Sequence, residues 1–205
     1  MDFRQPVAAL VPGARGRVLQ ALAASDRELS LSVLGQLAGV SVNQVPRVVD
    51  HLAALGVVTR RSVPPSTLVT LERGNLAARL VLALADLHST AIDSLRELAS
   101  NLRPPPLSAV AYGSFASGTA GADSDIDVAI VHADQSFETS EWASSLAGFV
   151  DEASACLGNV VSIAELATSE IADGALDEPF WEAVQATQLV LAGSAITKDL
   201  RDAAA

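Results

Sequence analysis

The chain has 205 residues, of which 50% are hydrophobic and only 4% are aromatic. This length suits one large or two small domains, and the apolar content allows a core without disulfides or structural metals. Cys156 is the only cysteine, which excludes an intramolecular disulfide and favours a reducing, cytoplasmic compartment. The longest apolar stretch, Leu76–Leu87, contains Arg79 and Asp86 and is too short for a membrane span, so we expect no membrane partner.

The net charge of −11 is unevenly distributed along the chain. Residues 1–75 contain eight basic and five acidic side chains, which gives a net charge of +3. Residues 101–205 contain three basic and sixteen acidic side chains, which gives −13. Such an asymmetry predicts two modules with different partners.

Three consecutive prolines, Pro104 to Pro106, mark the expected junction, because they cannot continue a helix and favour an extended connector. We therefore predict an N-terminal domain, a connecting helix with the proline linker, and a C-terminal domain, over residues 1–74, 75–106 and 107–205.

The N-terminal part has helical periodicity followed by strand patterns. The expected helices are Val11–Ala24, Val33–Ala38 and Val42–Leu55. Ser30 or Ser32 is expected to cap the second of these and Ser41 the third, and glycines at positions 39 and 56 end them. The buried stripe of the third helix is expected to contain Val45, Val48, Val49, Leu52 and Leu55. Strands then follow at Val57–Arg60 and Thr67–Leu71, with an amphipathic helix over Asn75–Leu102.

Beyond the prolines, strand and helix patterns alternate, which predicts an α/β layer. The expected strands are Leu107–Tyr112, Ile126–Val131, Val160–Ile163 and Leu189–Leu191. The expected helices are Trp142–Leu157 and Glu178–Thr187.

Two aspartates, Asp125 and Asp127, stand two positions apart at the start of an expected strand. Because side chains alternate along a strand, both carboxylates are predicted on one face, where their repulsion calls for a cation. Oxygen ligands of this kind suit Mg²⁺, which also binds substrate phosphates. Upstream, Gly113 and Ser114 follow a strand directly and form a turn that can offer N–H groups and a hydroxyl to a phosphate. This combination is typical of phosphoryl or nucleotidyl transfer, and the alternative is a glycine-rich surface loop with solvated aspartates.

The pattern of Gly113-Ser114, Gly118 and Ser124-Asp125-Ile126-Asp127 resembles the signature of the polymerase-beta-like nucleotidyltransferase superfamily. It is most similar to the minimal nucleotidyltransferases of prokaryotic toxin–antitoxin and regulatory loci. The resemblance covers about residues 107–195 and implies a nucleotidyltransferase fold of the α/β (α+β) class. It implies an NTP such as ATP as substrate or ligand, and one or two Mg²⁺ ions. The residues implied at the nucleotide are Gly113, Ser114 and Ser124, and the catalytic, metal-binding residues are Asp125 and Asp127.

Two features depart from the pattern of that superfamily. Its members usually supply a third carboxylate from the next strand, where this chain has Asn159 or Val161. Asn159 could bind a metal through its amide oxygen but could not act as a base. Glu165, the nearest acid, is expected to begin the next helix. Basic residues are also scarce in residues 101–205, where they are Arg103, Lys198 and Arg201.

Three helices followed by a two-stranded hairpin resemble a winged helix-turn-helix domain of prokaryotic transcription regulators. The resemblance implies a mainly α domain over residues 1–74 that binds double-stranded DNA, with the second helix of the Ser30–Leu55 pair in the major groove. Asn and Gln can bind adenine, and Arg can bind guanine or phosphate. The residues implied in DNA binding are Ser41, Asn43, Gln44, Arg47, Arg60 and Arg61. The alternative is a winged helix that serves protein contacts or dimerisation.

Two main hypotheses for the whole chain follow. In the first, a DNA-binding protein transfers NMP from an NTP to a hydroxyl acceptor; in the second, a non-catalytic regulator senses a nucleotide or binds a partner. A further, antitoxin-like reading has the protein modify or mask a partner protein encoded beside it. The net charge of +3 implies modest DNA affinity per subunit, so we expect a homodimer on a two-part site. The expected dimer element is Asn75–Leu102, and the alternative is a helix that packs on its own domain.

Overall fold

The computed structural model describes residues 1–133, 139–172 and 178–197. The chain forms two compact units, one over Gln5–Leu87 and the other combining Met1–Arg4 with His88–Ala205. This division lies upstream of the three prolines at which the sequence predicts the junction. Helix α6 (Leu87–Ser100) accounts for the difference, because its buried alanine and leucine side chains belong to the core of the second unit.

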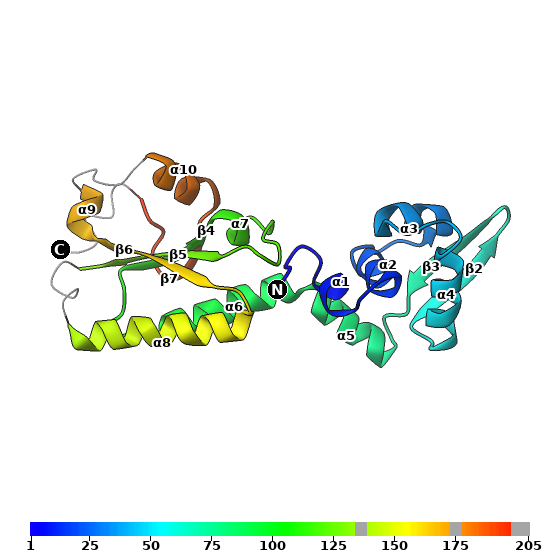
Figure 1. The fold of residues 1–205 in the computed structure, drawn as a ribbon, viewed down its shortest axis with the longest axis horizontal. Helices are drawn as coiled ribbons and strands as arrows, with labels where there is room; N and C mark the ends of the chain where they lie inside the picture. The colour runs from blue at the N-terminus through cyan, green and yellow to red at the C-terminus, as the bar shows by residue number, and fades with distance from the viewer. Residues whose placement is uncertain (134–138, 173–177, 198–205) are drawn as a thin grey trace. The chain divides into compact units, whose positions relative to one another are not determined.

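The Gln5–Leu87 unit is a bundle of helices with a small sheet at one end (Figure 1). Helix α2 is central and contacts α1, α3, α4 and α5. Strand β3 lies between β1 and β2 and is antiparallel to both. The elements are α1 (Pro6–Leu10), α2 (Ala14–Ala23), β1 (Leu29–Ser30), α3 (Leu31–Ala38), α4 (Val45–Ala54), β2 (Val58–Val63), β3 (Ser66–Leu71) and α5 (Leu76–Ala85).

Helices α3 and α4 begin and end where short-range chemistry requires. The Ser30 hydroxyl accepts a hydrogen bond from the Val33 N–H at 3.2 Å, and Gly39 ends α3 in the left-handed conformation. Helix α4 begins later than the sequence predicts, because Pro46 is tolerated only in the first turn of a helix. The helix ends at Ala54, so Leu55, predicted to be buried, lies outside its apolar stripe and is 58% exposed.

Two other predicted helices differ from the structure. The helix predicted over Val11–Ala24 begins only at the start of α2, because Pro12 and Gly13, which has φ of 79°, precede it. Helix α1 is a separate helix that was not predicted from the sequence. The long helix predicted over Asn75–Leu102 divides at Asp86, which has φ −93° and ψ 18°. Neither glycine nor proline occurs at that break, so the sequence contains no local signal for it.

The second unit is a mixed α/β fold built on a sheet of strand order β6-β5-β4-β7. Strands β5 and β6 are parallel and are connected through α8, while β4 is antiparallel to both β5 and β7. The elements after α6 are β4 (Ser108–Tyr112), α7 (Gly113–Ala116), β5 (Ile126–His132), α8 (Ser140–Leu157), β6 (Val161–Ala167), α9 (Thr168–Ala172), α10 (Glu178–Thr187) and β7 (Leu189–Gly193).

Helices cover both faces of this sheet. Figure 1 shows α7, α9 and α10 on one side and α6 and α8 on the other. The first side holds a core cluster that includes Val110, Ala129 and Val131 from the two central strands together with Trp181 of α10. Asp127 belongs to this side, because residues two apart along β5 share a face. Within the described residues, no helix has both the length and the apolarity needed to cross a lipid bilayer.

Candidate functional site

The two aspartates lie where strand β5 begins. Asp125 is exposed and immediately precedes the strand, and Asp127 is the second residue of the strand and is half-buried. Asp127 pairs in register with Tyr112, the last residue of β4. The pairing therefore brings the residue that follows Tyr112, Gly113, to the Asp127 carboxylate.

Gly113 and Asp127 are in close approach. A Cβ atom added to Gly113 would lie 3.0 Å from Asp127 Oδ2, and the glycine has φ of 70°, which side chains rarely adopt. The Gly113 N–H donates a hydrogen bond to Thr187 Oγ1 at 2.9 Å. Thr187 ends α10 and in turn donates to the Ala183 carbonyl. Sequence reasoning missed Thr187, because only the folded sheet brings residues this far apart in the chain together.

Ser114 and Ser124, the other residues expected at the nucleotide, take different places. Ser114 lies in the short helix α7, and its carbonyl accepts a hydrogen bond from the Thr119 N–H at 2.8 Å. Ser124 Oγ accepts from the Gly121 N–H at 3.0 Å, and so it closes the turn that leads into Asp125. The role of both serines at a nucleotide stays a prediction.

The surroundings of Asp125 and Asp127 disfavour a negative charge on both carboxylates at once. Burial raises the pKa of the Asp127 carboxyl, and the nearby charge of Asp125 raises it further. Burial likewise raises the pKa of the Tyr112 phenol, with a further contribution from the Asp127 charge. A cation bound to both carboxylates would relieve this repulsion. Two carboxylates also suit Mg²⁺, which usually retains several waters and uses few protein ligands.

Strand β6 contributes no acid beside Asp127. The residue in register with Asp127 is Ser162, while Val161 pairs with Ile126 and belongs to the opposite face. Glu165 lies within β6, so the expectation that it begins a helix is wrong. Its side chain accepts a hydrogen bond from Trp142 Nε1, on the face covered by α8. Among the described residues, no group of three His, Cys, Asp or Glu side chains is arranged to hold a metal ion.

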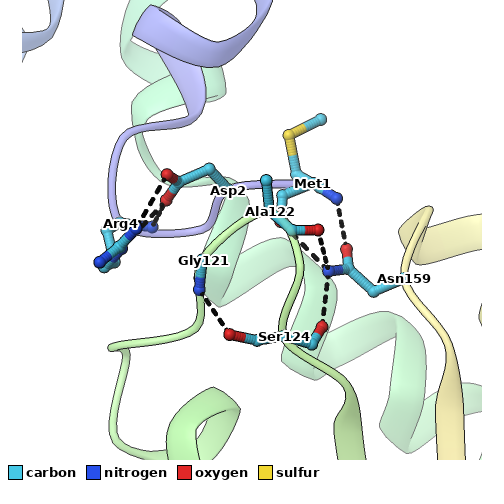
Figure 2. A network of polar contacts seen from close by, with 7 residues as sticks. All are labelled: Met1, Asp2, Arg4, Gly121, Ala122, Ser124 and Asn159. Atoms are coloured by element: carbon cyan, nitrogen blue, oxygen red, sulfur yellow. Dashed lines mark hydrogen bonds and ion pairs between the residues drawn. The ribbon is translucent and has the colours of Figure 1, made fainter.

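Asn159 precedes β6, is 7% exposed, and has its side-chain amide engaged by the protein. Its Oδ1 accepts a hydrogen bond from the Met1 amino group at 2.5 Å. Its Nδ2 donates to the carbonyl oxygen of Ser124 at 2.9 Å, with longer contacts to the carbonyls of Met1 and Ala122 (Figure 2). The amide thus binds the segment that immediately precedes Asp125.

Among the described residues, the basic side chains of this unit are Arg4, Arg96 and Arg103. Arg103 donates to the carbonyls of Ser100 and Leu102, while Lys198 and Arg201 lie outside the described residues. Arg4, which the sequence assigned to the N-terminal domain, belongs to this unit. Its guanidinium lies beside Gly121 and forms an ion pair with Asp2 at 3.3 Å.

The residues expected to bind DNA are all exposed on the Gln5–Leu87 unit. Ser41, Asn43 and Gln44 occupy the turn between α3 and α4, and Arg47 lies in the first turns of α4. Both wing arginines are in ion pairs: Arg60 with Asp50, and Arg61 with Glu28. The hydrogen bond from Arg61 lowers the pKa of Glu28.

We predict that Gly113→Ala displaces the Asp127 carboxylate. The methyl group would meet Oδ2, and the left-handed backbone adds strain of about 1–2 kcal/mol. Gly158→Ala is the matched control, because Gly158 has φ of 71° and no atom within 4 Å of the added Cβ. Both variants should lose a similar free energy of unfolding, measured by denaturant titration. Only Gly113→Ala should also shift the NMR titration of the Asp127 carboxyl carbon, and an unshifted titration would contradict the close approach.

We predict that Asp125→Asn lowers the pKa of Asp127, measured by carboxyl-carbon NMR, but leaves it above its ordinary value because burial is the larger cause. The folded protein holds this proton more tightly than the unfolded chain, so the free energy of unfolding decreases as pH rises through the interval between the two pKa values. That decrease should be smaller in Asp125→Asn. Asp123→Asn, an exposed neighbour, is the control and should leave both quantities unchanged.

The comparison with known proteins bears on the second unit only. No curated protein matches the chain. Residues 91–171 match the family model described as "Nucleotidyltransferase domain". The matched segment runs from α6 to α9 and contains Gly113, Ser114, both aspartates and Asn159, but it leaves out residues 1–90 and residues 172–205, which include α10 and β7. This segment of the second unit is therefore similar to a nucleotidyltransferase domain.

Proposed function

We propose that the protein is a Mg²⁺-dependent enzyme that transfers NMP from an NTP to a hydroxyl acceptor. The observation that carries the proposal is the close approach of the Gly113 turn to the Asp127 carboxylate, with Asp125 two residues upstream. A phosphate held at the turn would then adjoin a metal held by the carboxylates, as nucleotidyl transfer requires. The nucleotidyltransferase domain match over residues 91–171 supports the class of reaction.

Each residue of the site has a distinct task in this proposal. Asp125 and Asp127 would hold Mg²⁺, which when bound offsets the negative charge of the phosphates. Ser114 would orient the phosphates through its hydroxyl. Thr187 keeps the Gly113 N–H engaged and so fixes the conformation of the turn next to Asp127.

The reaction is a displacement at the α-phosphorus of the NTP. The acceptor hydroxyl oxygen forms a bond to that phosphorus, while the bond to the oxygen that bridges to the β-phosphate breaks and pyrophosphate leaves. The register of β6 sets Ser162, not an acid, beside Asp127. We therefore assign the proton of the acceptor hydroxyl to the solvent and not to a third carboxylate.

Incubation of the purified protein with each α-labelled NTP and Mg²⁺ tests the proposal. We expect label transfer with stoichiometric release of pyrophosphate. In Asp127→Asn, the transfer rate should fall on the order of a thousandfold, because the variant loses several kcal/mol of charge stabilisation in the transition state.

Asp151→Asn is the matched control for this experiment, because Asp151 is exposed on α8, on the other side of the sheet. It should transfer label at the wild-type rate, and circular dichroism should show both variants folded. Equal transfer by wild type and Asp127→Asn would overturn the assignment of the aspartates.

We also propose that the Gln5–Leu87 unit is a winged helix-turn-helix domain that binds double-stranded DNA. The supporting observations are the order of its elements, in which α3 and α4 precede the β2–β3 hairpin, and the exposed polar residues at the start of α4. Helix α4 would enter the major groove, and the hairpin would contact the backbone. The ion pairs of Arg60 and Arg61 are exposed, so breaking them to reach phosphates would cost little free energy.

We propose further that the DNA-binding form is a homodimer that pairs through α5. Leu76 and Leu80 lie one helical turn apart on this helix and are 76% and 73% exposed. Pairing two copies would bury both and would double the positive charge that faces DNA. Sedimentation velocity of the protein alone should show a dimer, and a monomer at all concentrations would contradict this part.

We predict that Arg47→Ala weakens DNA binding about tenfold, because a single arginine contact to a base or phosphate contributes roughly 1–3 kcal/mol. Fluorescence anisotropy with a labelled mixed-sequence duplex, repeated at several salt concentrations, measures the effect. Arg15→Ala, which removes an exposed arginine of α2, away from both α4 and α5 in the sequence, is the control and should bind as wild type does. Unchanged binding in Arg47→Ala would count against α4 as the recognition helix.

A second candidate function is a non-catalytic, antitoxin-like regulator whose nucleotidyltransferase domain senses a nucleotide or binds a partner protein. The observation that favours it is the neighbour of Asp127 on β6, which is Ser162 and not an acid. DNA binding without NMP transfer, for all labelled NTPs, would select this function over the enzyme.

A further inference from the structure

The segment that leads into Asp125 is hydrogen-bonded to Asn159, which is also hydrogen-bonded to Met1 (Figure 2). Asn159 Nδ2 donates a hydrogen bond to the Ser124 carbonyl at 2.9 Å. On the other side of Asp125, the Ile126 N–H donates to the Val160 carbonyl at 2.8 Å. Asp125 therefore lies between two hydrogen bonds to the consecutive residues Asn159 and Val160, which restrict its backbone from both sides.

The chemistry at Asn159 requires an amide. The side chain is 7% exposed, its oxygen accepts from the Met1 amino group, and its nitrogen donates to main-chain carbonyls. A carboxylate in its place could still accept but could not donate to the Ser124 carbonyl. Two oxygen atoms would then face each other in a buried position, which costs free energy unless one of them moves.

The residues Met1–Arg4 extend this attachment to the Gly113 turn. Phe3 is 5% exposed and packs edge-to-face against Phe115 of α7, with ring centroids 5.2 Å apart. His88 completes the cluster, since its Nε2 lies 2.7 Å from the Phe115 carbonyl oxygen. One short segment thus contacts α7, which begins at Gly113, and Asn159, which is hydrogen-bonded to the residues before Asp125.

We infer that Asn159 is a positioning residue that fixes the Asp125 carboxylate relative to Asp127 and the Gly113 turn, with Phe3 anchoring the Met1–Arg4 segment against it. The role of these contacts of Asn159 and Phe3 in NMP transfer rests on the proposed function. It replaces the expectation that Asn159 itself binds the metal. A positioning residue and a metal ligand predict opposite effects on metal affinity when a carboxylate replaces the amide at position 159. One substitution therefore distinguishes the two roles.

The test is Asn159→Asp, with Asn101→Asp as a control that makes the same change at an exposed position of the same unit. Mn²⁺ serves as the probe, and its binding is followed by electron paramagnetic resonance. As a positioning residue, Asn159→Asp should weaken Mn²⁺ binding roughly tenfold, as the loss of an outer-shell partner typically does. If residue 159 faced the metal, the added carboxylate would tighten binding instead, and that result would overturn the inference.

Hydrogen exchange of the backbone amides supplies a second readout that needs neither metal nor substrate. The amides of Gly121, Ser124 and Ile126 should exchange on the order of tenfold faster in Asn159→Asp, because the local opening free energy falls. In Asn101→Asp they should exchange at the wild-type rate. Unchanged exchange in Asn159→Asp would overturn the inference whether or not the protein is an enzyme.

Phe3→Ala tests the same attachment of the Met1–Arg4 segment without altering Asn159. It keeps the inference testable if the Asn159→Asp variant fails to fold. It should accelerate exchange at the same amides and weaken Mn²⁺ binding in the same direction. A wild-type protein that neither binds Mn²⁺ nor transfers NMP would defeat the proposed function. The exchange measurements would in that case still decide whether Asn159 and Phe3 hold the segment before Asp125.

Discussion

The candidate site depends on the antiparallel pairing of β4 with β5. Because Tyr112 and Asp127 are in register, the chain that leaves β4 turns directly next to the Asp127 carboxylate. Gly113 occupies this position, where a side chain would meet the Asp127 carboxylate and would strain the left-handed backbone. A shift of one residue in this pairing would turn Asp127 to the face covered by α8 and would separate it from the turn.

The same pairing sets the electrostatic character of the site. Asp127 is half-buried within β5, whereas Asp125, which precedes the strand, is exposed to solvent. The buried member of the pair therefore has its pKa raised both by burial and by its partner's charge. A cation bound to both carboxylates would remove an unfavourable interaction that the fold itself imposes.

The chain contains two units of opposite net charge, and one of them is built from two segments that are separated in the sequence. Residues Met1–Arg4 belong to the same unit as His88–Ala205, and the whole helical unit lies between them in the sequence. As a result, the first four residues add Phe3 and Arg4 to an otherwise acidic domain. Met1 binds Asn159, and Phe3 packs on Phe115, so the two residues contact the surroundings of the aspartate pair and of the Gly113 turn.

The sequence by itself determined the features that depend on short-range chemistry. A serine cap at the start of α3, the glycine that ends α3, and the strand that carries Asp127 all follow from patterns within a few residues, although the choice of Ser30 over Ser32 came from the structure. Tertiary structure alone decided that Thr187 meets Gly113, that Glu165 belongs to the far face of the sheet, and that Asn159 binds Ser124 and Met1. These contacts join residues distant in the chain, and their partners are selected by strand register and by burial, which no local pattern encodes.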